Sequence, residues 1–266
     1  MENFEFRPSP EVEVEEKTFT QEVEQYIVNE IETNFDVQAV TRLTDSLERT
    51  NMFLLGEMHG VAENPNIIYT LFKKFGFKRL ALEWDGQELQ ELVNEFLNTG
   101  QLDSEYIKAK DGGDGRITAG HFALLKKLKQ ENLLDDIILF NAGAEDWNNR
   151  DKAMADNILT NEADETTLVI AGDYHTRTES FTFDGETELH HPMGEYIKKQ
   201  VQDLSSGKII YLSGQYFNRG PSNLLDISEY GNPDTAQFYQ AEDGLYYYSI
   251  PKAHLAIVPN PSNIRS

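Results

Sequence analysis

The chain has 266 residues, of which 39% are hydrophobic and 11% aromatic, so it can bury a large core without disulfides or structural metal. It carries 46 acidic residues against 23 Lys and Arg, a formal charge of −23, and so lacks the basic surface that binds nucleic acids or anionic membranes. The absence of cysteine excludes disulfides, thiolate nucleophiles and Cys-ligated zinc or iron–sulfur sites.

The first 18 residues are expected to form an acidic flexible arm. Segment 11–16, Glu-Val-Glu-Val-Glu-Glu, follows two prolines and offers no apolar stripe that a helix could bury. No basic stretch followed by an apolar run opens the chain, and no run of about 18 apolar residues occurs in it. We therefore expect a cytoplasmic protein without membrane contacts, in which residues 19–266 form a single α/β hydrolase-like domain.

Apolar residues recur at helical spacing between Phe19 and Leu47, which predicts one or two helices there. From residue 52 onward, short apolar runs typical of strands buried on both faces alternate with helical patterns. This alternation predicts an α/β fold with a mostly parallel central sheet flanked by helices. The predicted strands are 52–55, 79–83, 137–140, 168–171 and 209–212, and the predicted helices are 64–75, 87–97, 119–131, 149–160 and 192–201.

Local signals mark the ends of some of these elements. Asn64 is an acceptable N-cap before Pro65, and Gly76 is expected to end the same helix. Asp-Gly at 243–244 lies between two β-rich segments, which predicts a C-terminal antiparallel hairpin within 237–248. Residues 255–258 are expected to form a last edge strand.

Polar side chains follow four successive predicted strands at the point where each strand ends. Ligands of open parallel sheets bind at this edge, so we expect these side chains to meet in one cluster. An arginine that opens a helix is unfavourable for the helix dipole, which indicates another reason for its presence. The candidate catalytic residues are Glu57, His59, Glu83, Arg150 and His175.

Both strand-end histidines occur in the same frame, Gly-x-x-His, at 56–59 and 172–175. Two imidazoles and a carboxylate form a common hydrolytic metal set, so His59, His175 and Glu57 are candidate ligands for a divalent ion such as Mn, Co or Zn. Without metal, His59 is a candidate general base and Arg150 a candidate oxyanion stabiliser. A single such frame is more often structural, and His121, within a predicted helix, is interpreted as a structural histidine.

Four segments together resemble one superfamily: 54–60 (Leu-Leu-Gly-Glu-Met-His-Gly), 82–83 (Leu-Glu), 150–157 (Arg-Asp-Lys-Ala-Met-Ala-Asp-Asn) and 170–175 (Ile-Ala-Gly-Asp-Tyr-His). The chain resembles the group that joins erythromycin esterases, ChaN-like haem-binding lipoproteins and Tiki metalloproteases. The resemblance implies a parallel-sheet core with its site at the strand ends. The paired Gly-x-x-His frames are similar to the metal-binding frames of Tiki proteases, whereas 150–157 is more similar to erythromycin esterases, in which a glutamate and histidines carry hydrolysis.

Three hypotheses on function follow. The first is a hydrolase that cleaves an ester, lactone or amide bond in a small-molecule or peptide substrate. The second is a ChaN-like protein that binds haem iron or another metal-bearing ligand without catalysis, with haem as its cofactor. The third is an interaction role in which the acidic arm is a docking segment. The sequence leaves the oligomeric state open.

Overall fold

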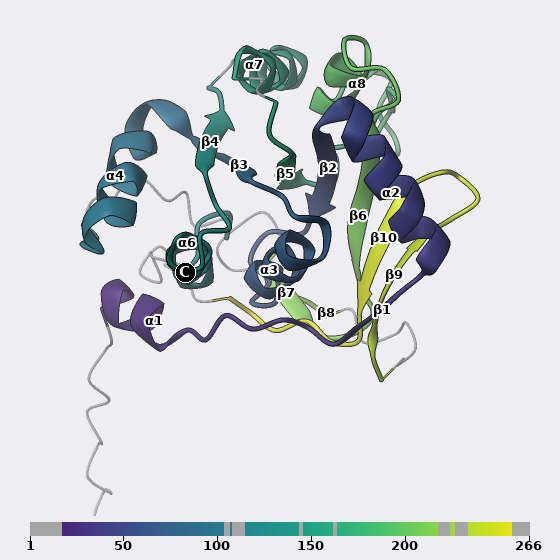
Figure 1. Cartoon of the computed structure of the whole chain (residues 1–266). Coiled ribbons are helices and arrows are strands. Elements are labelled where there is room, and N and C mark those ends of the chain that lie inside the picture. Colours follow the sequence, from purple (N-terminus) through teal and green to yellow (C-terminus); the bar gives the residue numbers. More distant parts are fainter. Residues whose placement is uncertain are drawn as a thin grey trace, which may run out of the picture.

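Eight strands form one sheet in the computed structural model, which describes residues 18–103, 107, 115–143, 146–161, 164–217, 224–226 and 234–256 (Figure 1). The order across the sheet is β1-β9-β10-β6-β2-β5-β3-β4. Every neighbouring pair is parallel except β9 and β10, which are antiparallel. The predicted α/β class, with a mostly parallel sheet and a C-terminal antiparallel hairpin, is therefore confirmed.

The strands are short, as the apolar runs predict. Those of the main sheet are β1 (Thr33–Phe35), β2 (Met52–Glu57), β3 (Arg79–Asp85), β4 (Asp136–Asn141), β5 (Thr167–Gly172), β6 (Ser205–Tyr211), β9 (Ala236–Gln240) and β10 (Tyr246–Ile250). A separate antiparallel pair consists of β7 (Gln215–Phe217) and β8 (Leu224–Asp226).

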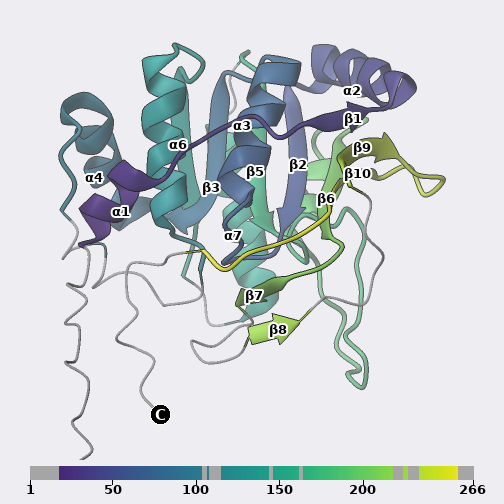
Figure 2. The same ribbon diagram turned by 90° about the horizontal axis from the view of Figure 1, so that it is seen from below.

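Helices cover both faces of the central strands, as the two views show (Figures 1 and 2). The described helices are α1 (Phe19–Gln25), α2 (Val37–Thr50), α3 (Asn64–Phe75), α4 (Gly86–Thr99), α6 (Ala119–Gln130), α7 (Trp147–Thr160) and α8 (Met193–Lys198). None of these described helices is long and apolar enough to cross a membrane.

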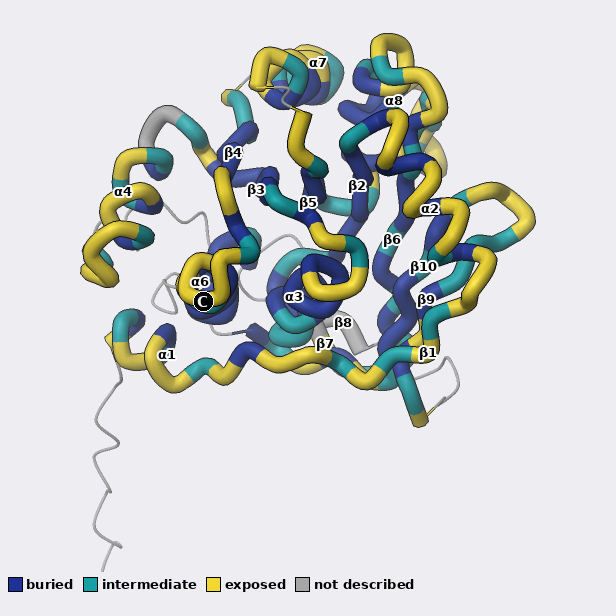
Figure 3. Tube along the Cα trace, viewed as in Figure 1, coloured by how far each residue is buried: buried dark blue, intermediate teal, exposed yellow. Residues whose placement is uncertain are grey.

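Alternation along the strands divides the core into two layers. Phe53 and Leu55 of β2 belong to the larger apolar cluster, together with α3 and α6, whereas Leu54 belongs to a second cluster with α7 and α8. Burial follows the same pattern, with the strands buried at the centre and the outer helix surfaces exposed (Figure 3). The two-sided burial explains why the central strands are continuous apolar runs rather than alternating ones.

Several predicted boundaries are wrong. Asn64 is the first residue of α3 rather than its N-cap, and its buried amide donates to the Met58 carbonyl at 2.9 Å. The helix predicted over 192–201 is confined to α8, which has six residues. Leu255 forms only an isolated bridge with Val61, so the described part of 255–258 is not a strand, and 257–258 lie outside the described residues. Gly76 ends α3 in the left-handed conformation, as expected.

Candidate active site

Three adjacent strands, β2, β5 and β3, end at the same edge of the sheet and carry the cluster. Glu57 is the last residue of β2 and lies on the α3 face with Leu55, two residues earlier. Glu83, two residues after Ala81 in β3, lies on the α7 face. Both carboxylates are buried, with 4% of each residue exposed. The two glutamates therefore reach the edge from opposite faces of the sheet.

Glu83 lies at the centre of the cluster. Arg150 Nη2 donates to its Oε1 at 2.5 Å, and Arg116 Nη1 donates to the same oxygen at 3.1 Å. The backbone N–H of Gly172 donates to Oε2 at 2.8 Å. Burial alone would raise the pKa of Glu83, but His175, His59 and Arg116 outweigh it and hold this pKa well below its usual range. Glu83 is therefore a buried anion that gathers basic groups around it.

His59 lies between the two glutamates. Its Nδ1 is 3.2 Å from Glu57 Oε1, and its Nε2 is 3.6 Å from Glu83 Oε2, which is too long for a hydrogen bond. Burial alone would lower the pKa of His59, but the hydrogen bond with Glu57 and the negative charges of Glu57 and Glu83 raise it to about 9. The other oxygen of Glu57, Oε2, is buried and has no hydrogen-bond partner in the described part of the chain. A buried acceptor without a partner marks a place for a water or a substrate donor.

His175 is held from behind by a buried carboxylate. Its Nδ1 lies 2.7 Å from Asp151 Oδ1, and the backbone N–H of Met193 donates to the other oxygen of Asp151 at 2.9 Å. The Trp147 ring stacks on the imidazole, with centroids 4.7 Å apart and planes at 18°. These contacts fix the ring so that Nε2 faces Glu83 Oε1 at 3.7 Å and Arg150 Nη1 at 3.4 Å.

The backbone of Gly172 lies close to these groups. A Cβ at this position would lie 3.2 Å from His59 Nε2, 3.5 Å from His175 Cδ2 and 3.6 Å from Glu83 Oε2. Both imidazoles and the central carboxylate therefore converge on this glycine. The glycine of the second Gly-x-x-His frame is needed here for room, not only for a turn.

A separate set of hydrogen bonds fixes the loop between Glu57 and His59. Asn64 donates to the Met58 carbonyl, and the Met58 N–H donates to the Tyr211 hydroxyl at 3.3 Å. That hydroxyl in turn donates to Asn64 Oδ1 at 2.7 Å. His121 is buried, and its Nδ1 forms a hydrogen bond with the Thr118 hydroxyl at 2.8 Å. Burial lowers the pKa of His121.

All five sequence-predicted residues thus lie in one cluster. Sequence analysis missed Arg116, Asn141 and Asp151 as members of it. Asn141 Oδ1 accepts from Arg150 Nε at 3.1 Å and from Nη2 at 2.9 Å. Asp151 directly follows Arg150, and Asn141 directly follows the strand predicted over 137–140, so the sequence positions of both pointed to this edge of the sheet. The position of Arg116, in the segment before α6, gave no such indication.

No protein-family model matches the sequence, and no curated protein is significantly similar to it. Solved structures nevertheless share its fold. A Bacillus cereus protein is 12% identical, with a TM-score of 0.59, and the match covers 91% of this chain and 100% of that one. A succinoglycan biosynthesis protein is 10% identical, with a TM-score of 0.56, over 90% of this chain and 97% of that one.

The third similar structure is a mutant erythromycin esterase in its open conformation. It is 11% identical to this chain, with a TM-score of 0.57, and the match covers 82% of this chain and 94% of the esterase. The sequence resemblance predicts an erythromycin esterase/ChaN-like fold, and these structures confirm that fold.

Proposed function

We propose that this protein is a hydrolase that cleaves an ester, lactone or amide bond with His59 as general base. The observation that carries the proposal is the convergence of His59 Nε2, His175 and Glu83 beside the Gly172 backbone. One solved structure with this fold is an esterase, which supports the same reaction class. The substrate is a small molecule or a peptide.

The hydrogen bond to Glu57 holds the His59 proton on Nδ1, so that Nε2 of the neutral ring is the basic nitrogen. A water bound at Nε2 loses a proton to it as the water oxygen attacks the substrate carbonyl. The negative charge then develops on the carbonyl oxygen, where Arg150 stabilises it. His59 finally returns the proton to the leaving oxygen or nitrogen as the scissile bond breaks.

The donor groups do not suit a divalent ion. Two guanidinium groups already bind Glu83, and Arg150 Nη1 lies 3.4 Å from His175 Nε2, the nitrogen that a metal would need. Among the described residues, no group of three His, Cys, Asp or Glu side chains is arranged to hold a metal. The same guanidinium of Arg150 would also stand between haem iron and His175 Nε2. The proposed reaction steps therefore involve neither a metal ion nor haem.

The test is hydrolysis of a panel of carboxylic esters, lactones, amides and peptides by the purified chain. We expect His59→Gln and Gly172→Ala each to lower kcat/KM by about 100-fold or more, the first by removing the base and the second by placing a methyl group against His59 Nε2 and displacing it. The matched controls are His254→Gln, an exposed histidine that also pairs with a glutamate, and Gly143→Ala, where a Cβ meets nothing within 4 Å.

Both control variants should retain the full rate. Unchanged hydrolysis in His59→Gln, or no turnover of any panel member by the parent chain, would refute the proposal. A Soret band on haem titration that disappears in His59→Gln would favour the non-catalytic alternative.

A further inference from the structure

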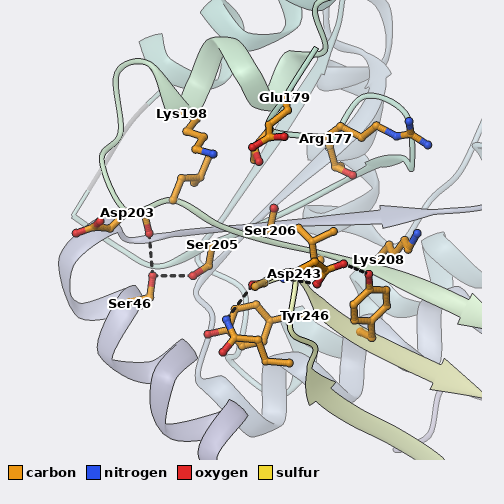
Figure 4. A pocket seen from close by; sticks show the side chains of 18 of the residues that line it. Ser46, Arg177, Glu179, Lys198, Asp203, Ser205, Ser206, Lys208, Asp243 and Tyr246 are labelled. Carbon is orange, nitrogen blue, oxygen red and sulfur yellow. Dashed lines mark hydrogen bonds between the residues drawn. The ribbon is translucent and has the colours of Figure 1, made fainter. Parts of the chain in front are cut away.

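A cavity of about 870 Å³, whose lining contains none of the five candidate catalytic residues, lies between the loop after β5, β6 and the β9–β10 turn (Figure 4). Its floor includes Lys208 and Tyr247, which alternation places on the sheet face opposite the larger apolar cluster. The crossover from β5 to β6, residues 173–204, contains only the six-residue α8 as a helix. This crossover covers too little of the sheet, so the face over β6 and β10 stays open as a groove.

The groove gathers basic side chains in a strongly acidic protein. Five basic residues line it, together with five acidic ones, whereas the whole chain has twice as many acids as bases. They come from α2, from the loop after β5, from α8 and from β6. The basic residues are Arg42, Arg49, Arg177, Lys198 and Lys208.

Three of these cations are not neutralised by a salt bridge in the described part of the chain. Arg42 bonds only the neutral amide of Gln240, at 2.9 Å. Lys208 lies over the Tyr247 ring, 5.5 Å from its centroid, and Lys198 is exposed at the end of α8. A cation on an aromatic ring or a neutral amide keeps its capacity to bind an anion.

The other two cations make only loose ion pairs. Arg49 is 3.9 Å from Asp203, and both side chains are more than half exposed. Arg177 is also 3.9 Å from its partner, Asp173. Exposed pairs at this separation contribute little stability, so an incoming anion can replace either partner.

Two acidic residues of the groove, Asp243 and Glu179, differ in the contacts they make. Asp243 is already bound, because it accepts from the Tyr247 hydroxyl at 2.6 Å and from the Leu245 N–H at 3.0 Å. Glu179 lies on the wall opposite the floor strands, near Lys198 and Arg177 (Figure 4). A carboxylate beside an anion site accepts hydrogen bonds from hydroxyl groups of the same ligand.

We propose that this groove binds a phosphorylated polyhydroxy compound, such as a sugar phosphate. Lys198, Lys208 and Arg42 supply the positive charge that attracts the phosphate, and Glu179 accepts from the hydroxyls. The volume suits a molecule larger than a free phosphate ion. This site is independent of the proposed hydrolysis, because none of the five candidate catalytic residues lines it.

The test is isothermal titration calorimetry of the full chain at low salt with glucose 6-phosphate, inorganic phosphate and glucose. We expect the sugar phosphate to bind most tightly. The double variant Lys198→Gln, Lys208→Gln should weaken its binding by at least about tenfold, as expected for the loss of charged contacts to phosphate. Glu179→Gln should weaken glucose 6-phosphate and leave inorganic phosphate unchanged.

The matched control is Lys126→Gln, Lys129→Gln, which removes the same charge from exposed positions on α6, far from the groove lining. It should bind as the parent does. The proposal is overturned if glucose 6-phosphate does not bind, if inorganic phosphate binds equally well, or if the control weakens binding as much as the groove variant. Hydrolysis by the groove variant is expected to be unchanged, so failure of this site leaves the proposed reaction standing.

Discussion

His59 is held between two carboxylates, and this position sets the pH at which it can act. Its pKa is raised to about 9 by Glu57 and Glu83 against the opposing effect of burial. A general base must be neutral, so we expect kcat/KM to rise with pH through this range and to level off above it. Glu57→Gln removes one of the charges that hold the proton, so the rising limb should move to lower pH.

The measurement is a pH–rate profile of both proteins on the same substrate, with Glu63→Gln as a control, since Glu63 pairs with His254 instead. A profile that falls between pH 7 and 9 in the parent would contradict a base role for His59. Stability should change in the opposite sense. The raised pKa of His59 contributes stability that is complete below its unfolded value of 6.5 and is lost as pH rises through about 9.

The site residues at the ends of strands could be predicted from the sequence, because parallel sheets bind their ligands at the edge where the strands end. Glu57, Glu83 and His175 each follow an apolar run by a few residues, so their meeting follows from the topology alone. The stacking of Trp147 on His175 could not be predicted, because it depends on how α7 crosses the sheet. That Glu57 Oε2 finds no hydrogen-bond partner among the described residues likewise depends on side-chain geometry.

At the scale of elements, one face of α7 contributes residues both to the candidate active site and to the hydrophobic core. Trp147, Arg150 and Asp151 lie in its first turns at the edge of the sheet. Met154, Ala155 and Ile158 follow at helical spacing and pack in the second apolar cluster. The position of the catalytic groups therefore depends on how firmly the first turn of this helix is formed.

Asp146 caps that turn by accepting from the Asn149 N–H at 2.8 Å. We expect Asp146→Ala to lower the free energy of unfolding by about 1 kcal/mol and to lower kcat as well, because Arg150 and His175 lose their fixed geometry. Asp36→Ala is the matched control, since Asp36 caps α2 through the Ala39 N–H at 2.7 Å and α2 carries no cluster residue.

Denaturant unfolding and kinetics on the two variants separate these effects. Equal stability loss with a slower rate only in Asp146→Ala is the expected result. Equal rates in both variants would show that the first turn of α7 does not position the site.

Elements of ordinary length and strong periodicity were predictable, whereas short ones were not. β1 has three residues and no alternation, and it exists because it pairs in parallel with β9, which lies 200 residues later. The helix expected over 192–201 shortens to α8, because the chain turns away after Lys199 instead of continuing along the sheet. For β1, distant strand pairing therefore decides the structure that the local pattern does not predict.

At the scale of the whole molecule, a formal charge of −23 repels itself most strongly in the compact state. Raising NaCl from about 10 to 150 mM shortens the screening length to about 8 Å, so we expect the thermal midpoint to rise over this range. Sucrose at equal osmolality is the control for effects other than screening. A midpoint that falls with added salt would show that local ion pairs outweigh the general repulsion.

The strand order has a consequence for how the protein comes off the ribosome. β5 lies between β2 and β3, although it is made after both. Until residue 172 has emerged, those two earlier strands have no neighbour to join them, and the carboxylates at their tips have neither the Gly172 amide nor the imidazole of His175 beside them. A nascent chain of about 160 residues should therefore be a client for chaperones, and the candidate active site is complete only when β5 has paired with β2 and β3.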